Sequence, residues 1–373
     1  MQGLKFAENF SSRRKQLGMT QGDVAAYVGV SNAAVSKWEQ GISYPDLSLL
    51  PKLATLLDVT IDALLGYEPQ LTRAKIIELY QGFAKRMSEE SFEQVQADIE
   101  AMLKEYYACY PFLIRIAQLY LNYFINARQP ELVLQRIVEL CERTVTHSGD
   151  YQMSQEAHML HASVLLLSGK PQELLQHLGE GITIEYGTDQ MIAQAHAMLG
   201  DMHKAQQMLQ ASVFQNIFSI ISSETERLTF EVESPQRFDE TVRRIEQIMK
   251  LYNTAGLNIH MALMFYYKAA RGYMQQQRPK EALRMLECYY RACEGLTFPI
   301  QIRGDHYFDL VNDWIAQNIH LGPYAPRDEQ AIKKDMLKLL QQDPSFVPLH
   351  DDPAFKALIT NLRHVLKLKE ENP

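Results

Sequence analysis

The sequence predicts an all-α protein, with a small five-helix module followed by a long array of paired helices. Three observations support this. The 373 residues are 46% hydrophobic and 22% charged, as in a folded globular protein. Leucine is abundant, β-branched residues are few, and apolar residues recur at helical spacing with few turn clusters between them. The chain is also too long for one ordinary domain.

Five short helices are expected in the first 66 residues, near 4–17, 20–28, 31–40, 46–57 and 61–65. Thr20 and Ser31 can accept hydrogen bonds from the free N–H groups at the starts of the second and third helices. Asp23 is favourably placed in the first turn of the second helix. Gly29 supplies the left-handed residue that a short turn between two helices needs.

The third helix is expected to end at Gly41, and Pro45 prevents its continuation. Apolar residues with helical spacing across the five segments predict one compact core. They are Val24, Ala25, Val28, Val30, Val35, Trp38, Leu50, Leu53, Leu57 and Leu64.

The segment TQGDVAAYVGVSNAAVSKWEQGISYPD resembles the phage-repressor, or XRE-type, helix-turn-helix domain, and the likeness covers about the first 66 residues. The resemblance implies double-stranded operator DNA as a partner, with the third helix in the major groove. Asn32, Ala33 and Lys37 would face the bases, and Ser36 is a further candidate. An amide suits adenine, an ammonium suits guanine, and a methyl group suits the methyl of thymine.

The same resemblance implies contacts to the DNA backbone. Gln21 matches the family's phosphate-contacting glutamine, and Ser43 and Tyr44 fall in the loop that also meets phosphates. Such contacts position a domain without reading sequence. Arg14 and Glu39 correspond to a family ion pair between the first and third helices, so we assign them to stability.

Two of the base-contact candidates have a competing interpretation. Asn32 lies in the first turn of its helix and is alternatively a solvated terminal residue. Lys37 is alternatively a solvated surface residue. Trp38 is able to stack on the DNA backbone, but its place on the apolar side of the helix favours a core role. Few other donors lie nearby, so we expect a modest intrinsic affinity for DNA.

The charge of the chain is divided by region. Residues 1–66 carry six Lys/Arg and six Asp/Glu, so the net charge of −8 belongs to the remainder. An acidic body repels phosphates, which would turn the neutral N-terminal module toward DNA and weaken non-specific binding.

The stretch 67–71, with Pro69, is expected to be a linker, and residues 72–373 an array of helices that bury their faces by stacking. The expected helices lie near 72–86, 90–107, 111–127, 130–146, 152–168, 171–178, 189–199, 201–223, 236–254, 258–276, 279–293, 304–319, 328–342 and 353–368. In the segment DPSFVPLHDDPAFKALI we expect tight turns whose aspartates cap helices.

One helix pair resembles a tetratricopeptide repeat. In MALMFYYKAARGYMQQQRPKEALRMLECYYRA, five residues approximate the repeat's spacing of aromatic, small, aromatic, small and large: Tyr266, Ala270, Tyr273, Ala282 and Leu286. The resemblance implies an α-solenoid whose concave face suits a peptide or helix.

The combination of these two parts resembles the peptide-sensing Rgg, PlcR, NprR and PrgX group of regulators from Gram-positive bacteria, which implies a role in quorum sensing. In that group, asparagines on inner helices hold a signalling peptide, since an amide offers both a donor and an acceptor. Asn122 and Asn126, one helical turn apart, are the candidates here. A solvated polar stripe is the competing interpretation.

A homodimer is expected, because one recognition helix covers only a few base pairs and two half-sites lie about 34 Å apart, or a multiple of that. The rival hypothesis is a scaffold, whose array binds a protein partner while DNA binding is secondary or lost.

Other classes receive little support from the sequence. The four cysteines form no CxxC pair. The histidine pairs His158/His161 and His196/His203 lack a third metal ligand at diagnostic spacing. No phosphate loop or catalytic signature is present. We therefore expect no enzyme activity, cofactor or metal. The N-terminus lacks a signal-peptide core, and no segment has the roughly 20 apolar residues that span a bilayer, so a cytoplasmic protein without a membrane partner is expected.

Overall fold

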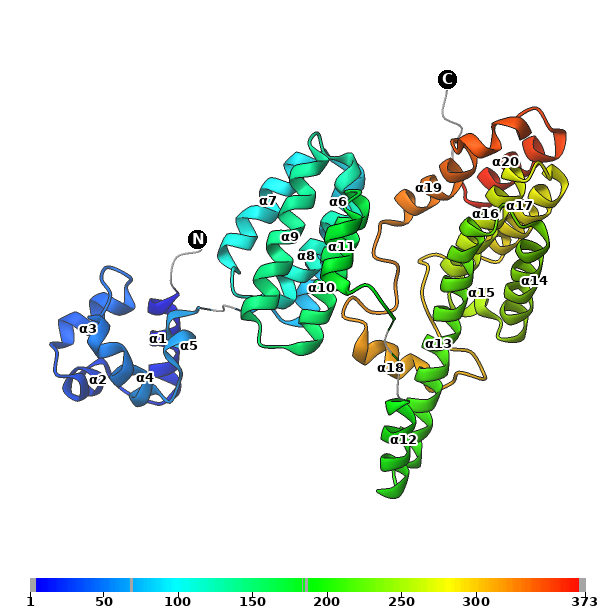
Figure 1. Cartoon of the computed structure of the whole chain (residues 1–373). Coiled ribbons are helices and arrows are strands. Elements are labelled where there is room, and N and C mark those ends of the chain that lie inside the picture. The colour runs from blue at the N-terminus through cyan, green and yellow to red at the C-terminus, as the bar shows by residue number, and fades with distance from the viewer. Residues whose placement is uncertain (1–4, 68–69, 183, 185–186, 369–373) are drawn as a thin grey trace. The chain divides into compact units, whose positions relative to one another are not determined.

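The computed structural model describes residues 5–67, 70–182, 184 and 187–368. Regular structure in these ranges is helical, apart from one isolated antiparallel bridge between Gln301 and Tyr324 (Figure 1). The all-α prediction is confirmed. The expected start of the first helix at residue 4, and residues 68–69 of the expected linker, lie outside the described residues.

The N-terminal helices are those expected, to within a few residues at their ends. They are α1 Phe6–Gln16, α2 Gln21–Val28, α3 Asn32–Glu39, a 3₁₀ turn Leu47–Leu49, α4 Leu50–Leu57 and α5 Ile61–Leu65. The Thr20 hydroxyl accepts from the Asp23 N–H at 3.1 Å, and the Asp23 carboxylate accepts from the Thr20 N–H at 2.7 Å. Ser31 accepts from the Ala34 N–H at 3.2 Å. Gly29 ends α2 with φ +79°.

The core of this module contains every residue that the apolar pattern predicted, with Val30 at its edge. Trp38 is 4% exposed, and its ring meets Phe10 edge-on at 6.2 Å, so its core role is confirmed. Phe6 and Phe10 of α1, which were not among the predicted core residues, are also fully buried.

The remaining helices lie near the expected positions, and the short helix Thr254–Leu257 was not expected. They are α6 Arg73–Glu89, α7 Phe92–Glu105, α8 Tyr110–Tyr123, α9 Pro130–His147, α10 Tyr151–Leu167, α11 Pro171–Leu178, α12 Thr188–Met198, α13 Met202–Phe230, α14 Pro235–Leu251, α15 Thr254–Leu257, α16 Ile259–Gln275, α17 Pro279–Glu294, α18 Val311–Asn318, α19 Glu329–Gln341 and α20 Pro353–Val365. Short 3₁₀ segments lie at Phe124–Asn126 and Pro344–Leu349.

Three expected helices differ from the structure. The helix expected over 304–319 begins only at Val311, because the Asp305 carboxylate accepts the N–H groups of Tyr307 and Phe308 and holds a turn there. Helix α13 continues to Phe230, seven residues beyond its expected end. The helix expected over 111–127 ends at Tyr123. The expected capping is confirmed for two of the C-terminal aspartates, since Asp343 accepts from the 3₁₀ segment Pro344–Leu349 and Asp352 from the first turn of α20.

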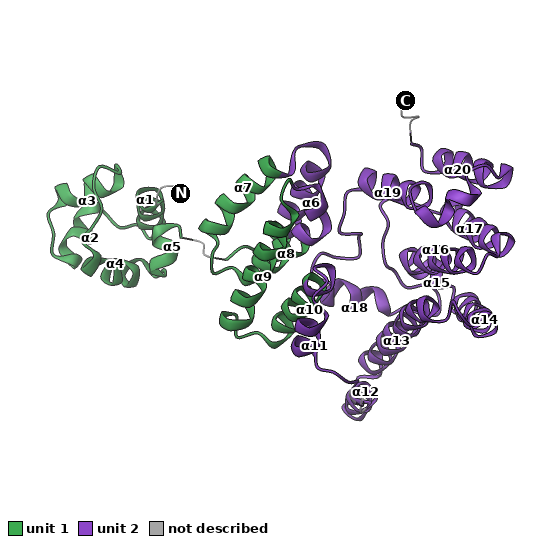
Figure 2. Ribbon diagram, turned by 45° about the horizontal axis from the view of Figure 1, so that its top comes forward, with its two compact units in different colours: residues 1–76, 93–118, 128–164 green, residues 77–92, 119–127, 165–373 purple. Residues whose placement is uncertain are grey.

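The chain divides into two compact units, coloured separately in Figure 2. One comprises residues 1–76, 93–118 and 128–164, and the other comprises 77–92, 119–127 and 165–373. The second unit contains a large apolar core built on α13, α14, α16, α17, α19 and α20. Ala270 of α16 and Ala282 of α17 are fully buried in it, as small residues between packed helices should be.

Candidate functional site

Helix α3 has two distinct faces. Val35 is fully buried and Trp38 nearly so, and these two residues fix the helix to the core. Asn32, Ala33 and Lys37 are all exposed to solvent. The structure therefore places three of the four predicted base-contacting residues on the accessible side of a rigidly held helix.

The fourth candidate and the loop after α3 are more enclosed. The Ser36 hydroxyl is half-buried and accepts from the Gln40 side chain at 3.1 Å. Ser43 is half-buried, and its N–H donates to the Lys37 carbonyl at 3.4 Å, which closes the end of the helix. Tyr44 is 55% exposed, and its ring rests edge-on against Phe6 at 6.1 Å.

A polar network holds α1, α2 and α3 together. The Arg14 guanidinium contacts both carboxylate oxygens of Glu39, with Nη2 to Oε2 at 3.1 Å, and it also donates to the Met19 carbonyl. The predicted ion pair is therefore present, with side chains that are only 10% and 9% exposed. Gln21 joins it by donating from Nε2 to Glu39 Oε2 at 2.8 Å, a bond that the sequence did not predict.

The network also sets the charge state of Glu39. Burial by itself raises the pKa of this carboxyl group. The hydrogen bonds from Arg14 and Gln21, together with the positive charges of Arg14 and Lys15, outweigh burial, and the pKa of Glu39 lies below its ordinary value. Glu39 therefore stays ionised at neutral pH and keeps Arg14 paired.

The second unit contains a cavity of about 460 Å³. Its walls are mainly apolar and also include three amide side chains and one charged pair. Asn122, a predicted effector-binding residue, lies in the lining; the other lining residues include Asn258, His260, Leu263, Met264, Tyr289, Ile300, Gln301, Arg327, Ile332, Asp335, Met336 and Leu339. This size and composition are typical of small-ligand sites.

Asn126 does not share this position. Helix α8 ends at Tyr123, and Asn126 lies in a 3₁₀ turn, is exposed, and does not line the cavity. In a 3₁₀ turn each residue advances by a third of a turn, so residues four apart no longer lie on one face. The expected pairing of Asn122 with Asn126 on one helical face is therefore wrong.

One wall of the cavity is an irregular segment, residues 321–328, which we call the strap. Its backbone pairs with residues 300–302, through the Ile302 N–H to the Pro323 carbonyl at 2.8 Å and the Ala325 N–H to the Ile300 carbonyl at 2.9 Å.

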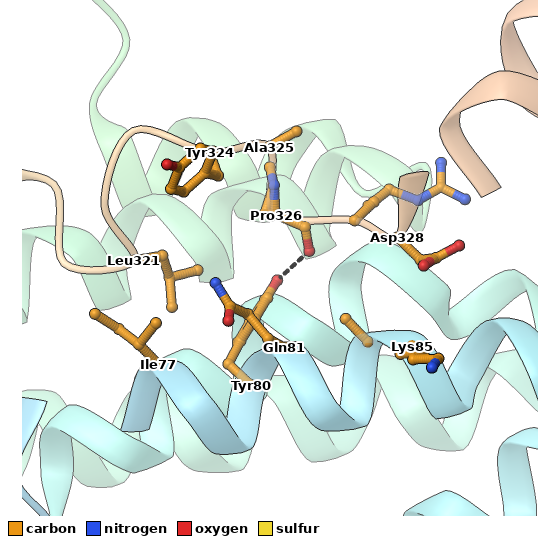
Figure 3. A pocket seen from close by; sticks show the side chains of 11 residues that line it. Ile77, Tyr80, Gln81, Lys85, Leu321, Tyr324, Ala325, Pro326 and Asp328 are labelled. Carbon is orange, nitrogen blue, oxygen red and sulfur yellow. Dashed lines mark hydrogen bonds between the residues drawn. The ribbon is translucent and has the colours of Figure 1, made fainter. Parts of the chain in front are cut away.

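The other face of the strap meets α6 and α8. The Tyr80 hydroxyl donates to the Pro326 carbonyl at 2.9 Å (Figure 3) and accepts from the Asn122 amide at 3.1 Å. The Tyr123 hydroxyl accepts from the Asp328 N–H at 2.9 Å. The sequence did not predict the strap, because it has no helical periodicity and its partners lie far away in the chain.

Arg327 is the charged residue of the strap. It pairs with Asp335, and its guanidinium lies 5.3 Å from the centre of the Tyr123 ring. Its buried Nε has no hydrogen-bond partner among the described residues. Such an atom is costly to bury unpaired, by about 1–3 kcal/mol.

The described residues hold no cluster of three or more side chains suited to a metal ion. Among the same residues, no helix is both long enough and apolar enough to cross a membrane.

Comparison with known proteins agrees with the geometry of the first module. Residues 11–64 match the family model described as helix-turn-helix. This segment is therefore a helix-turn-helix domain, of the XRE type that its sequence resembles.

Its relatives are transcription regulators. The chain is 36% identical over 72 residues to the HTH-type transcriptional activator BcrR of Enterococcus faecalis. The matched residues are 19% of this chain and 35% of that protein. It is 33% identical over 63 residues to the cryptic phage CTXphi transcriptional repressor RstR of Vibrio cholerae, covering 17% of this chain and 56% of the repressor. It is 37% identical over 63 residues, 17% of this chain, to the uncharacterized HTH-type transcriptional regulator YqaE of Bacillus subtilis, and covers 54% of it. The chain thus spans between about a third and somewhat more than half of these relatives.

Among solved structures, the apo form of the competence regulator ComR from Streptococcus vestibularis aligns with 86% of this chain and 98% of its own, at 13% identity and a TM-score of 0.27. That TM-score is too low to relate the helical arrays of the two proteins.

Proposed function

We propose that the protein is a sequence-specific DNA-binding transcriptional regulator. Residues 1–66 bind operator DNA, and residues 67–71 form the linker to the array. Residues 72–373 form that array, which dimerises and responds to an effector. Asn32, Ala33, Ser36 and Lys37 contact base edges. Gln21, Ser43 and Tyr44 contact phosphates. The activator and repressor activities of the relatives motivate this proposal for the whole chain.

The observation that carries the proposal is the two-faced helix α3 inside a matched helix-turn-helix domain. Its buried face is held by Trp38 and its end by the Arg14–Glu39 pair. The exposed face is therefore presented in a fixed orientation, which reduces the entropy lost on binding DNA.

For the array, we propose an effector with an apolar body and hydrogen-bonding groups, most simply a short peptide. The mainly apolar cavity with amide groups in its lining supports this class of ligand. Asn122 is the proposed contact from α8, with its Nδ2 already donating to Tyr80 and its carbonyl left to accept from a peptide N–H. Asn126 lies outside the cavity and would contact the effector only beyond its rim.

The test is selection of genomic DNA fragments by the purified full chain, followed by binding measurements on the enriched site. The double variant N32A/K37A should lose on the order of 100-fold in specific affinity, because two base contacts of about 1–3 kcal/mol each are removed. The control K15A loses the same charge from the exposed end of α1 and should retain specific binding.

Two outcomes count against the proposal. Unchanged specific binding by N32A/K37A would mean that α3 does not contact the bases. Failure of the wild-type chain to enrich any site, with and without extracts of spent culture medium, would favour the scaffold hypothesis instead.

A further inference from the structure

The helical hairpin made by α12 and the N-terminal half of α13 exposes an unusual amount of apolar surface. The six side chains Met191, Ile192, Met198, Leu199, Met202 and Leu209 are between 43% and 88% exposed. We call them the hairpin surface. In Figure 1, α12 lies along the first turns of α13 and apart from α14, α16 and α17 of the same unit.

Helix α12 obtains little stability from the core. All eleven of its residues are described, and Ala193 is the one that is buried. Isolated helices shorter than about 12–15 residues are marginal in water, and most helices in proteins are stabilised by packing of an apolar face. Here the large apolar side chains of the helix, Met191, Ile192 and Met198, point into solvent. A helix of this kind is stabilised when its outer face is covered.

The hairpin is nevertheless held in place by hydrogen bonds, which favours an ordered docking element over a flexible segment. Gln207 is 3% exposed and donates to the Leu310 carbonyl. Gln210 donates to Asp309 at 2.8 Å and accepts from the Leu310 N–H at 3.0 Å. These bonds anchor α13 to the segment before α18, so the surface is presented without a large ordering cost.

The small number of charged residues around the hairpin surface indicates which partner binds there. Residues 188–223 contain only Asp189, Asp201 and Lys204 as charged side chains, whereas 22% of the whole chain is charged. Depletion of charge is typical of interface cores. Two copies of a chain with net charge −8 repel each other elsewhere, but they meet here with almost no repulsion. A basic partner protein would instead be drawn to the acidic remainder of the chain.

The area is also suitable for a second copy. At about 100 Å² for a fully exposed side chain of this size, the six offer roughly 400 Å² of apolar surface. A standard interface buries about 800 Å² per partner, of which somewhat more than half is apolar. The hairpin surface therefore supplies most of the apolar part of one side of a stable dimer.

We propose that the hairpin surface is the homodimer interface of this protein, formed by the same residues of α12 and α13 from two copies around a two-fold axis. The proposal rests on the proposed function in one respect, namely that a regulator of this type needs two DNA-binding domains to meet two half-sites.

The test is the mass of the full chain in solution, measured by light scattering after size-exclusion chromatography over about 1–100 µM, a range that brackets micromolar dissociation constants. The wild-type chain should have twice the monomer mass of 42.9 kDa. The variants M198E/L199E and M191E/I192E should each raise the dimer dissociation constant at least about 100-fold, since they bury charges at the centre of the interface. The control L251E alters an equally exposed leucine on α14 of the same unit and should remain dimeric.

Circular dichroism checks that the double variants are folded. Both should retain the helix content of the wild-type chain, so that a loss of the dimer is not caused by unfolding. The proposal is overturned if the wild-type chain is a monomer throughout this range, or if both folded double variants remain dimeric. These failures differ from failure of the proposed function. A dimeric chain that enriches no DNA site contradicts the DNA-binding function and leaves the interface standing. A monomeric chain that enriches a site contradicts the interface and leaves DNA binding standing.

Discussion

The DNA-binding module and the cavity-bearing second unit are stabilised by contacts of very different range along the chain. In the module, the cap of α2 joins residues three apart, and the Arg14–Glu39 pair joins residues 25 apart. In the second unit, the bonds from Tyr80 to Pro326 and from Asp328 to Tyr123 span 246 and 205 residues. The cap and the ion pair of the module therefore join residues that are close in the chain, whereas the cavity wall of the second unit depends on long-range contacts made by hydroxyl groups.

The largest expected effect tests whether the two regions unfold independently. Replacing Trp38 by Ala removes a nearly buried ring from the small core of the module, at a cost of about 3–5 kcal/mol. In this variant the N-terminal module should already be unfolded at 25 °C. Calorimetry should therefore show no unfolding transition for the module and an unchanged unfolding transition for the array. The second tryptophan, Trp314 on α18, reports on the array by its fluorescence. The control I42A alters an exposed side chain and should change stability by no more than about 0.5 kcal/mol. A single transition that falls as a whole would contradict independent folding.

A second substitution tests independent unfolding by a change in the core of the array. Gly272 lies on α16 directly against the ring of Phe238, which a Cβ at this position would overlap. G272A should therefore cost about 1–3 kcal/mol in the array transition alone. The matched control is G82A on α6, where nothing beyond the adjoining residues and the nearby backbone of the same helix lies within 4 Å of the added methyl group. It should stabilise by about 0.5–1 kcal/mol, because alanine is the better helix former. Equal effects of the two substitutions in a urea titration would disprove the close packing at Gly272.

The sequence predicts contacts between residues that are close in the chain better than contacts between residues that are far apart. Thr20, Gly29 and Ser31 predict the turns of the DNA-binding module because each acts on backbone groups within a few residues. The sequence also singled out Asn122, which does line the cavity. It could not predict the partners of that residue, since nothing in the pattern around Tyr80 points to Pro326.

The error at Asn126 has a related cause. Periodicity predicts that a helix continues but does not show where an α-helix tightens into a 3₁₀ turn, as it does after Tyr123. The base and phosphate contacts remain predictions, because they came from resemblance to a family and depend on DNA.

The third prediction concerns pH and the module. The folded-state pKa of Glu39 lies below its ordinary value of 4.5, so its contribution to stability is fully present above that value and is lost as the pH falls through the folded-state pKa. E39Q leaves Arg14 without its charged partner and should cost about 1–3 kcal/mol at pH 7. In thermal unfolding from pH 7 to pH 3, the difference between wild type and variant should narrow below about pH 4.5. A difference that stays constant over this range would mean that Glu39 does not carry the pH dependence.

The smallest expected effect concerns the strap. Y80F removes the hydroxyl that donates to the Pro326 carbonyl and accepts from Asn122, which should cost about 0.5–1.5 kcal/mol. Because the strap has no helical bonds of its own, the loss should appear as faster amide hydrogen exchange in residues 321–328, with α2 and α3 unaffected. The control Y324F removes a hydroxyl within the strap that lies outside this network, and it should leave exchange unchanged. If Y80F and Y324F give equal exchange rates, the strap is held by its pairing with residues 300–302 and not by the hydroxyl of α6. The second unit would then hold its cavity wall by contacts as local as those of the DNA-binding module.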